Sequence, residues 1–418
     1  MRSKGILPIL LLILCDATHA QAHADPVLEW NEIAFRVLND LPPPMQMRFG
    51  AIVQLAVFEG VNSVDGRYQS LVGIPRAAPD ASAPAAAVSA AHRVLRSYFP
   101  DHAAEYDAAR EKSLARIPDG PGRQAGLAAG QAAAMAVMAS RENDGAEKDA
   151  SYLPGSTAPG QWQPTPDCPP TGGVFLHWQD VKPFVIRRVK AFRSPPPPAL
   201  DSARYARAYA EVKEKGARDS TQRPADRTTV AKFYEVFGDA ALWNPVARQL
   251  AVEARQTLAE NAHAFALMNV ALHDLTIALV ETKYHYHFWR PETAIPAGAS
   301  DGNPRTEPDA SFLTLIPTPC HPGYPSGHAA TTGVAREVLE RIYGDSGHRI
   351  VLTHPSMPGV RFEYSTLGEI ADDIDDARVF GGIHFAFDQS AGREQGRRVG
   401  AHVFRQAFQP ARPCDHDR

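Results

Sequence analysis

The chain has 418 residues, a formal net charge of −4, 44% hydrophobic residues and 22% charged residues. This composition is that of an ordinary globular protein, and it excludes a collagen, a coiled-coil rod and a disordered chain. Because there is no basic excess, nucleic acid and anionic membrane surfaces are excluded as main partners, and a small-molecule substrate is expected.

The first residues, 1–24, have the pattern of a secretory signal peptide. Arg2 and Lys4 precede the apolar run 6–15, and small residues suited to cleavage follow before residue 25. A run of about ten residues is too short to cross a bilayer as a helix. We therefore expect an exported protein, periplasmic or secreted, with no membrane span.

Apolar residues recur at helical spacing through most of the remaining chain, and proline-rich stretches separate these segments. Hairpin dipeptides flanked by alternating β-branched residues are not found in the sequence, so the pattern predicts an all-α fold. The predicted helices cover 28–40, 46–65, 84–98, 101–115, 122–142, 203–215, 225–237, 241–281, 327–344, 363–379 and 388–408.

A faint internal repeat suggests how these helices are organised. Residues 51–59 can be laid on 266–274, with two alanines matching and an acid meeting an acid. Two amphipathic helices of similar composition could show this similarity without being related. The alternative, which we adopt as the prediction, is that residues 25–240 and 241–418 form two related helical bundles within one body, with the site in the C-terminal bundle.

The cysteines allow little cross-linking. Cys15 lies in the predicted signal peptide, which leaves Cys168, Cys320 and Cys414 and therefore at most one internal disulfide. The sequence does not say which two would pair. Three cysteines so far apart also argue against a zinc cluster.

Chemically informative residues gather in three segments of the C-terminal half. In the first, Lys283 and Arg290 are seven residues apart, two helical turns, so they would share a helix face and attract an anion. In the second, Ser326 and Gly327 follow prolines and open an apolar helical stretch. Backbone amides at such a helix start bind oxyanions.

The third segment adds an arginine, a histidine and an aspartate. Arg378 lies six residues before His384, and Asp388 lies four residues after it. One helical turn brings the carboxylate of Asp388 to the imidazole, where it can fix the tautomer.

The order Lys-x6-Arg-Pro, Pro-Ser-Gly-His, Arg-x5-His-x3-Asp resembles a three-part signature. That signature belongs to the superfamily joining vanadium-dependent haloperoxidases, type-2 phosphatidic acid phosphatases and bacterial non-specific acid phosphatases. The resemblance runs from Lys283 to Asp388, about a quarter of the chain. Ala377 stands where the third part usually has a serine, which removes a minor contact only.

The resemblance implies a role for each matched residue. His384 would bond the central atom, as the vanadium ligand or as a phosphorylated nucleophile, and Asp388 would orient it. His328 would act as acid and base on the opposite side. The remaining matched residues would hold vanadate, or phosphate in a phosphatase, through charge-assisted and neutral hydrogen bonds. They are Lys283, Arg290, Ser326, Gly327 and Arg378.

The resemblance implies a vanadium haloperoxidase that oxidises halide with hydrogen peroxide and passes it to a small organic acceptor. The chain length and the pair Phe288-Trp289 before Arg290 favour this branch. The first alternative is an acid phosphatase acting on phosphomonoesters through a phosphohistidine. The second is a non-catalytic oxyanion or metal binder, since His285, His287 and His321 could suit zinc or copper. The oligomeric state stays open.

Overall fold

The computed structural model describes residues 25–148 and 150–411, and this part of the chain contains thirteen α-helices and one two-stranded sheet. The predicted signal peptide, 1–24, lies outside the described residues. The mostly helical architecture confirms the predicted fold class. The small sheet is the exception to it.

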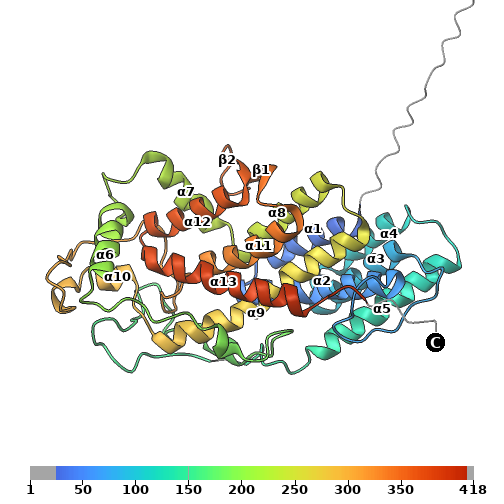
Figure 1. Cartoon of the computed structure of the whole chain (residues 1–418), viewed down its shortest axis with the longest axis horizontal. Helices are drawn as coiled ribbons and strands as arrows, with labels where there is room; N and C mark the ends of the chain where they lie inside the picture. Colours follow the sequence, from blue (N-terminus) through green and yellow to red (C-terminus); the bar gives the residue numbers. More distant parts are fainter. Residues whose placement is uncertain (1–24, 149, 412–418) are drawn as a thin grey trace, which may run out of the picture.

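The first helices gather at one end of the elongated molecule (Figure 1). Helices α1, α3 and α5 pack against α2, which also contacts the later helix α9. Nearly all of α2 is buried, because small and apolar residues surround its axis. These elements are α1 (Pro26–Leu38), α2 (Pro43–Asp65), α3 (Ala83–Tyr98), η1 (Pro100–His102), α4 (Ala103–Leu114) and α5 (Pro121–Ser140).

A long irregular connection, residues 141–202, follows α5 and runs back toward the middle of the molecule. It contains the short helices η2 (Leu176–Asp180) and η3 (Val189–Phe192), both of which contact α9. Two helices at the other end of the molecule follow, α6 (Ala203–Gly216) and α7 (Ala225–Val236).

The helix predicted over 241–281 is two helices, α8 (Asp239–Ala254) and α9 (Leu258–Tyr286). The break comes at Arg255, whose φ of 51° lies in the left-handed region and ends α8. Thr257 then begins α9 through a capping box with Glu260. Helical periodicity runs through both helices, so it could not reveal this turn.

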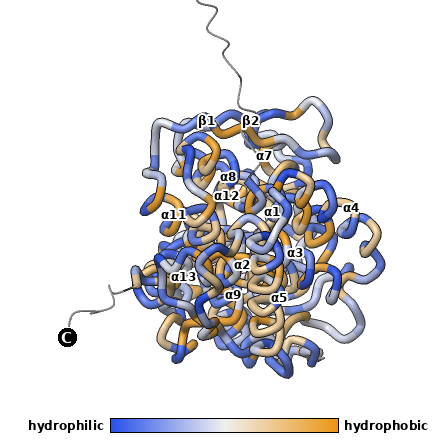
Figure 2. Tube along the Cα trace, turned by 90° about the vertical axis from the view of Figure 1, so that its right-hand side faces the viewer, coloured by the Kyte–Doolittle hydropathy of each residue, from blue (hydrophilic) through white to orange (hydrophobic). Residues whose placement is uncertain are grey.

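The helix α9 is the central element of the fold. Figure 2 shows α2 and α9 next to each other near the middle of the end-on view. By length and composition α9 could cross a membrane, yet 94% of its most apolar window is buried within the protein. The segments of the faint repeat, 51–59 and 266–274, lie on these two packed helices.

The last part of the chain places α11 and α13 beside α9, with α12 next to them (Figure 1). Gly333 of α11 and Gly396 of α13 show how closely α11 and α13 approach each other. A Cβ built on Gly396 would lie 1.9 Å from the Ala330 carbonyl oxygen. The elements of this part are α10 (Pro291–Ala294), η4 (Gly298–Ser300), α11 (Gly327–Tyr343), β1 (Ser346–Thr353), β2 (Arg361–Thr366), α12 (Leu367–Phe380) and α13 (Ala386–Gln406).

The strands β1 and β2 form an antiparallel hairpin that the sequence did not predict. The helix predicted over 363–379 therefore begins later, at Leu367, where Thr366 and Glu369 form a capping box. The hairpin contacts α8 through β1 and α12 through β2, and Ile350, Leu352 and Tyr364 are buried, so its strand conformation depends on tertiary packing. The boundary predicted at residue 240 falls near the start of α8, which contacts helices of both halves. The division into 25–240 and 241–418 stays a prediction.

Candidate active site

Two buried cations occupy the end of α9 and the residue before α10. Lys283 lies in the last turn of α9 with 3% of its surface exposed, and Arg290 is fully buried. The Lys283 ammonium donates hydrogen bonds to the carbonyl oxygens of Pro322 at 3.0 Å, Gly323 at 3.2 Å and Pro325 at 2.5 Å. Lys283 therefore holds the loop that leads into α11.

The Arg290 guanidinium is held from two sides. Its Nε and Nη2 donate to the carbonyl oxygen of His321 at 3.0 Å and to His321 Nδ1 at 3.2 Å. Its Nη1 donates to the Ile383 carbonyl oxygen at 3.0 Å and to His384 Nε2 at 3.1 Å. Burial lowers the pKa of Arg290 to about 9, so the group still carries its charge near neutral pH.

His384 lies in the turn between α12 and α13 and bonds to Asp388, one helical turn further on. His384 Nδ1 is 2.9 Å from Asp388 Oδ2, and that oxygen also accepts the Phe385 N–H at 3.1 Å. Because a guanidinium only donates, His384 Nε2 must accept from Arg290. The proton therefore sits on Nδ1, and the Nε2 lone pair points toward the cation.

Burial and neighbouring charge keep this imidazole neutral. Burial lowers the pKa of His384 well below its ordinary value, and the charge of Arg290 adds to the effect. Burial raises the pKa of the Asp388 carboxyl, while the N–H of Phe385 and the nearby cations oppose this rise and favour the carboxylate. A neutral imidazole with a free electron pair is the form that can ligate a central atom or attack one.

Ser326, Gly327 and His328 begin α11. The Ser326 hydroxyl caps the helix by accepting the Ala329 N–H at 3.5 Å, and the Ser326 N–H donates to the Asp388 carbonyl oxygen at 3.0 Å. This last bond ties the start of α11 to the start of α13. Gly327 and His328 are half-buried, and the helix start adds positive potential there.

Arg378 approaches from the last turn of α12. It is buried, and its Nη1 donates to the Tyr234 carbonyl oxygen at 2.9 Å. Its charge contributes to the lowered pKa values of both Arg290 and His384, which places it in the same electrostatic neighbourhood. The structure thus brings all three sequence segments together, although their functional roles stay predictions.

His321 is a member of this cluster that the sequence analysis considered only as a metal ligand. Its position seven residues before His328, in the same proline-rich segment, was the available signal. His285 instead contacts Arg193 at 3.1 Å, and His287 stacks on the ring of Tyr152. Among residues 25–148 and 150–411, no group of three or more His, Cys, Asp or Glu side chains is placed to hold a metal ion.

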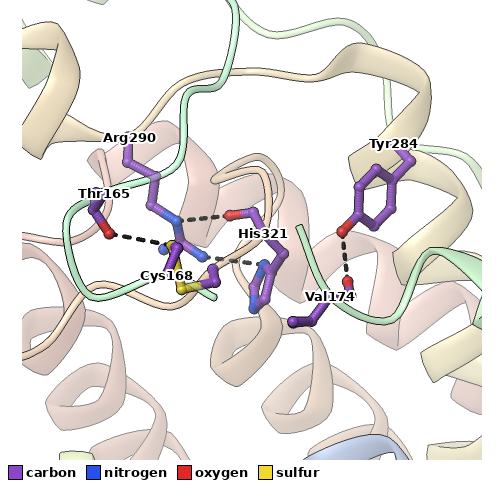
Figure 3. The surroundings of a disulfide bond; sticks show 7 residues. Thr165, Cys168, Val174, Tyr284, Arg290 and His321 are labelled. Carbon is purple, nitrogen blue, oxygen red and sulfur yellow. Dashed lines mark hydrogen bonds between the residues drawn. A yellow bond between two sulfur atoms is a disulfide. The ribbon is translucent and has the colours of Figure 1, made fainter. Parts of the chain in front are cut away.

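The structure resolves the pairing of the cysteines. Cys168 and Cys320 form a disulfide with a Cα–Cα distance of 5.4 Å, which joins the irregular connection after α5 to the residue before His321 (Figure 3). Neither cysteine stood out in the sequence as part of the site. Their proximity depends on how segments 152 residues apart come together.

A small cavity of about 70 Å³ lies beside Lys283, His321 and Gly327. Its apolar walls come partly from α2, through Met47, and partly from Phe175 of the long connection. Residues of the N-terminal half therefore shape the surroundings of the candidate site.

Comparison with known proteins bears on the half of the chain that carries this cluster. The family model of the VCPO second helical-bundle domain matches residues 263–412. The chain is also 29% identical over 152 residues to the vanadium chloroperoxidase of Curvularia inaequalis. The C-terminal part of this chain, residues 263–412, is therefore similar to the second helical-bundle domain of the vanadium chloroperoxidases. The match to the Curvularia protein covers 30% of this chain and only 24% of that relative.

Solved haloperoxidase structures share the fold over nearly the whole chain. A bacterial vanadium-dependent iodoperoxidase superposes with a TM-score of 0.77 at 23% identity, covering 92% of this chain and 98% of its own. A holo-type bacterial vanadium-dependent chloroperoxidase has a TM-score of 0.72 at 18% identity, covering 90% and 95%. At these identities the likeness extends to the fold alone.

The donor set of this cluster fits a tetrahedral oxyanion such as vanadate. Arg290, Lys283 and Arg378 supply three positive charges in a buried setting, where they gain strength from the low dielectric. His384 offers one ring nitrogen with a lone pair, and the α11 start adds neutral donors. An imidazole lone pair with cations around it suits a bound anion better than it suits a bare divalent metal ion.

Proposed function

We propose that this protein is an enzyme of the vanadium haloperoxidase type, which oxidises halide with hydrogen peroxide and transfers the oxidised halogen to a small organic acceptor. The observation that carries the proposal is the chain of contacts Arg290–His384–Asp388. It leaves a neutral, buried imidazole with its Nε2 lone pair directed at a cationic pocket. Vanadate, when bound to His384, would supply a Lewis-acidic centre that activates hydrogen peroxide toward the halide.

The buried cations would do the electrostatic part of the work. Lys283, Arg290 and Arg378 would balance the charge of the anion and hold it through charge-assisted hydrogen bonds. The lone pair of His384 Nε2 cannot serve Arg290 Nη1 and a bound anion at the same time. With the anion bound, Arg290 Nη1 would therefore donate to an anion oxygen instead of His384 Nε2. Asp388 would hold the proton on His384 Nδ1 throughout.

His328 would move protons on the side opposite His384. It is half-buried at the start of α11, whereas His384 is buried and bonded to Arg290. An imidazole in this position can take a proton from incoming peroxide and return it to a departing oxygen.

The alternative reaction is phosphomonoester hydrolysis at the same cluster. The contact that favours it is again the His384–Asp388 bond, because a neutral imidazole held by a carboxylate can attack phosphorus and form a phosphohistidine. A non-catalytic oxyanion binder is the third reading. The half-buried His328 argues against it, since a binder needs no proton carrier.

The deciding experiment is a paired assay on protein stripped of bound anion, with and without added orthovanadate. One arm follows bromination of a phenolic dye by peroxide, and the other follows hydrolysis of nitrophenyl phosphate. Vanadate-dependent bromination would support the proposal. Fast phosphate hydrolysis without vanadate, with negligible bromination, would establish the phosphatase instead, and inactivity in both arms would leave the binder.

We also propose that the protein is exported, on the basis of the sequence pattern of residues 1–24. Cellular fractionation of the expressed full-length chain tests this. Recovery of protein that begins near residue 25 in the periplasm or medium would support export, and retention of the intact chain in the cytosol would contradict it.

A further inference from the structure

The Cys168–Cys320 disulfide, which we call the clamp, is attached to the candidate site at one end and to the N-terminal half at the other. Cys320 directly precedes His321, and Cys168 belongs to the irregular connection after α5. Figure 3 shows the clamp beside Arg290 and His321, with Tyr284 and Val174 on the far side of the histidine. The clamp therefore lies one residue from His321, which accepts two hydrogen bonds from Arg290.

The Cys168 side of the clamp is itself anchored. Val174, six residues after Cys168, donates its N–H to the Cys320 carbonyl oxygen at 2.9 Å, and its own carbonyl oxygen accepts from the Tyr284 hydroxyl. Gly173 exchanges both backbone hydrogen bonds with Tyr152, at 2.7 and 3.2 Å. The clamp therefore ties the loop that carries His321 to a segment with fixed backbone partners.

On the Cys320 side, the loop supplies acceptors to two buried cations. His321 gives Arg290 its carbonyl oxygen and its Nδ1, and the carbonyls that follow within five residues of Cys320 accept from Lys283. If this loop withdrew, both cations would lose acceptors in a buried setting, where an unsatisfied charged donor is costly. The Arg290 guanidinium would then also lose its orientation toward His384.

We propose that the clamp and His321 are positioning residues that hold the Arg290 guanidinium in the orientation that receives the oxyanion. This inference rests on the proposed function, because it concerns the same anion. The clamp acts through His321, and His321 acts through Arg290. The His384 ring itself bonds to Arg290 and Asp388.

The experiment measures the dissociation constant for orthovanadate by calorimetry, together with the melting temperature, for wild type and variants. The double variant Cys168→Ser with Cys320→Ser should bind vanadate about tenfold more weakly at a temperature where it is fully folded. Gln163→Ala is the matched control. Gln163 lies in the same irregular connection and its side chain donates to the nearby Ser156 carbonyl oxygen, so its loss should leave the affinity unchanged.

A second variant does not depend on folding without the disulfide. His321→Ala keeps the clamp but removes the ring acceptor of Arg290, and it should also weaken vanadate binding. His321→Gln, which can offer a side-chain acceptor, should lie closer to wild type. Because both perturbations act on one guanidinium, combining His321→Ala with the double serine variant should weaken binding by less than the product of the two separate effects.

Three results would count against these claims. A lower melting temperature with unchanged vanadate affinity in the double serine variant would make the clamp merely structural and overturn the inference. Unchanged affinity in His321→Ala would do the same for the histidine. Failure of the wild-type protein to bind vanadate at all would instead overturn the proposed function, and the inference with it.

Discussion

The two ring nitrogens of His384 have opposite hydrogen-bonding roles, and the partner of each nitrogen determines whether it donates or accepts. Nδ1 faces the Asp388 carboxylate, which can only accept, and Nε2 faces the Arg290 guanidinium, which can only donate. The sequence spacing predicted the contact with Asp388. It could not predict the contact with Arg290, which is 94 residues away along the chain.

Replacing His384 by alanine should abolish oxyanion-dependent activity of either kind. The variant loses the only nitrogen that we assign to the central atom, so added vanadate should not restore bromination. The paired assay described above measures this. His285→Ala is the control, because His285 contacts Arg193 at the surface and should leave activity near the wild-type level. Full activity in His384→Ala would remove that residue from the mechanism.

Replacing His328 by alanine should separate binding from turnover. Vanadate affinity should be partly retained, because the cations and His384 are untouched, while turnover falls at least about a hundredfold through loss of the proton carrier. Calorimetry gives the affinity and dye bromination gives the rate. A variant that lost its affinity but kept its rate per bound site would contradict the role of His328.

At the scale of elements, the site depends on how α11 and α13 pack. The Ser326 N–H at the start of α11 bonds to the Asp388 carbonyl at the start of α13, so His328 and His384 move with these two helices. Gly396 of α13 allows this approach, since a Cβ there would meet the Ala330 carbonyl oxygen. Periodicity predicted both helices, but it carried no information on how close their axes come.

Substituting Gly396 by alanine should therefore strain the α11–α13 contact. The added Cβ would lie 1.9 Å from a backbone oxygen that cannot rotate away, so the helices must separate, at a cost of about 2 kcal/mol in unfolding free energy. Chemical denaturation measures the loss. Gly155→Ala, where a Cβ meets no atom within 4 Å, is the control and should stay near wild-type stability. Equal stability of the two variants would refute the close-packing argument.

At the scale of the whole molecule, α9 joins distant parts of the chain. His263 of α9 stacks on Tyr68 with ring centroids 3.9 Å apart, and its Nε2 lies 3.1 Å from the carbonyl oxygen of Phe408. Burial lowers the pKa of His263 to about 4, so it stays neutral in the folded protein where an exposed histidine would be protonated.

This buried histidine should make stability fall in acid. Its contribution is fully present above about pH 6.5 and is lost as the pH falls toward 4, because the unfolded state then binds a proton that the folded state does not. His263→Gln can still donate to Phe408 but cannot titrate. The wild type should lose about 3 kcal/mol of stability relative to this variant between pH 7 and pH 4. Parallel pH profiles from denaturation would contradict the assignment.

The local sequence pattern by itself determined most of the helices and the three segments that meet at the site, because helix periodicity and residue chemistry depend on residues close together in the sequence. Tertiary structure alone decided the break at Arg255, the β1–β2 hairpin and the Cys168–Cys320 pairing. It also decided that His321 holds Arg290. These features depend on contacts between segments far apart in sequence. A short stretch of sequence carries no information about the free energy of such contacts.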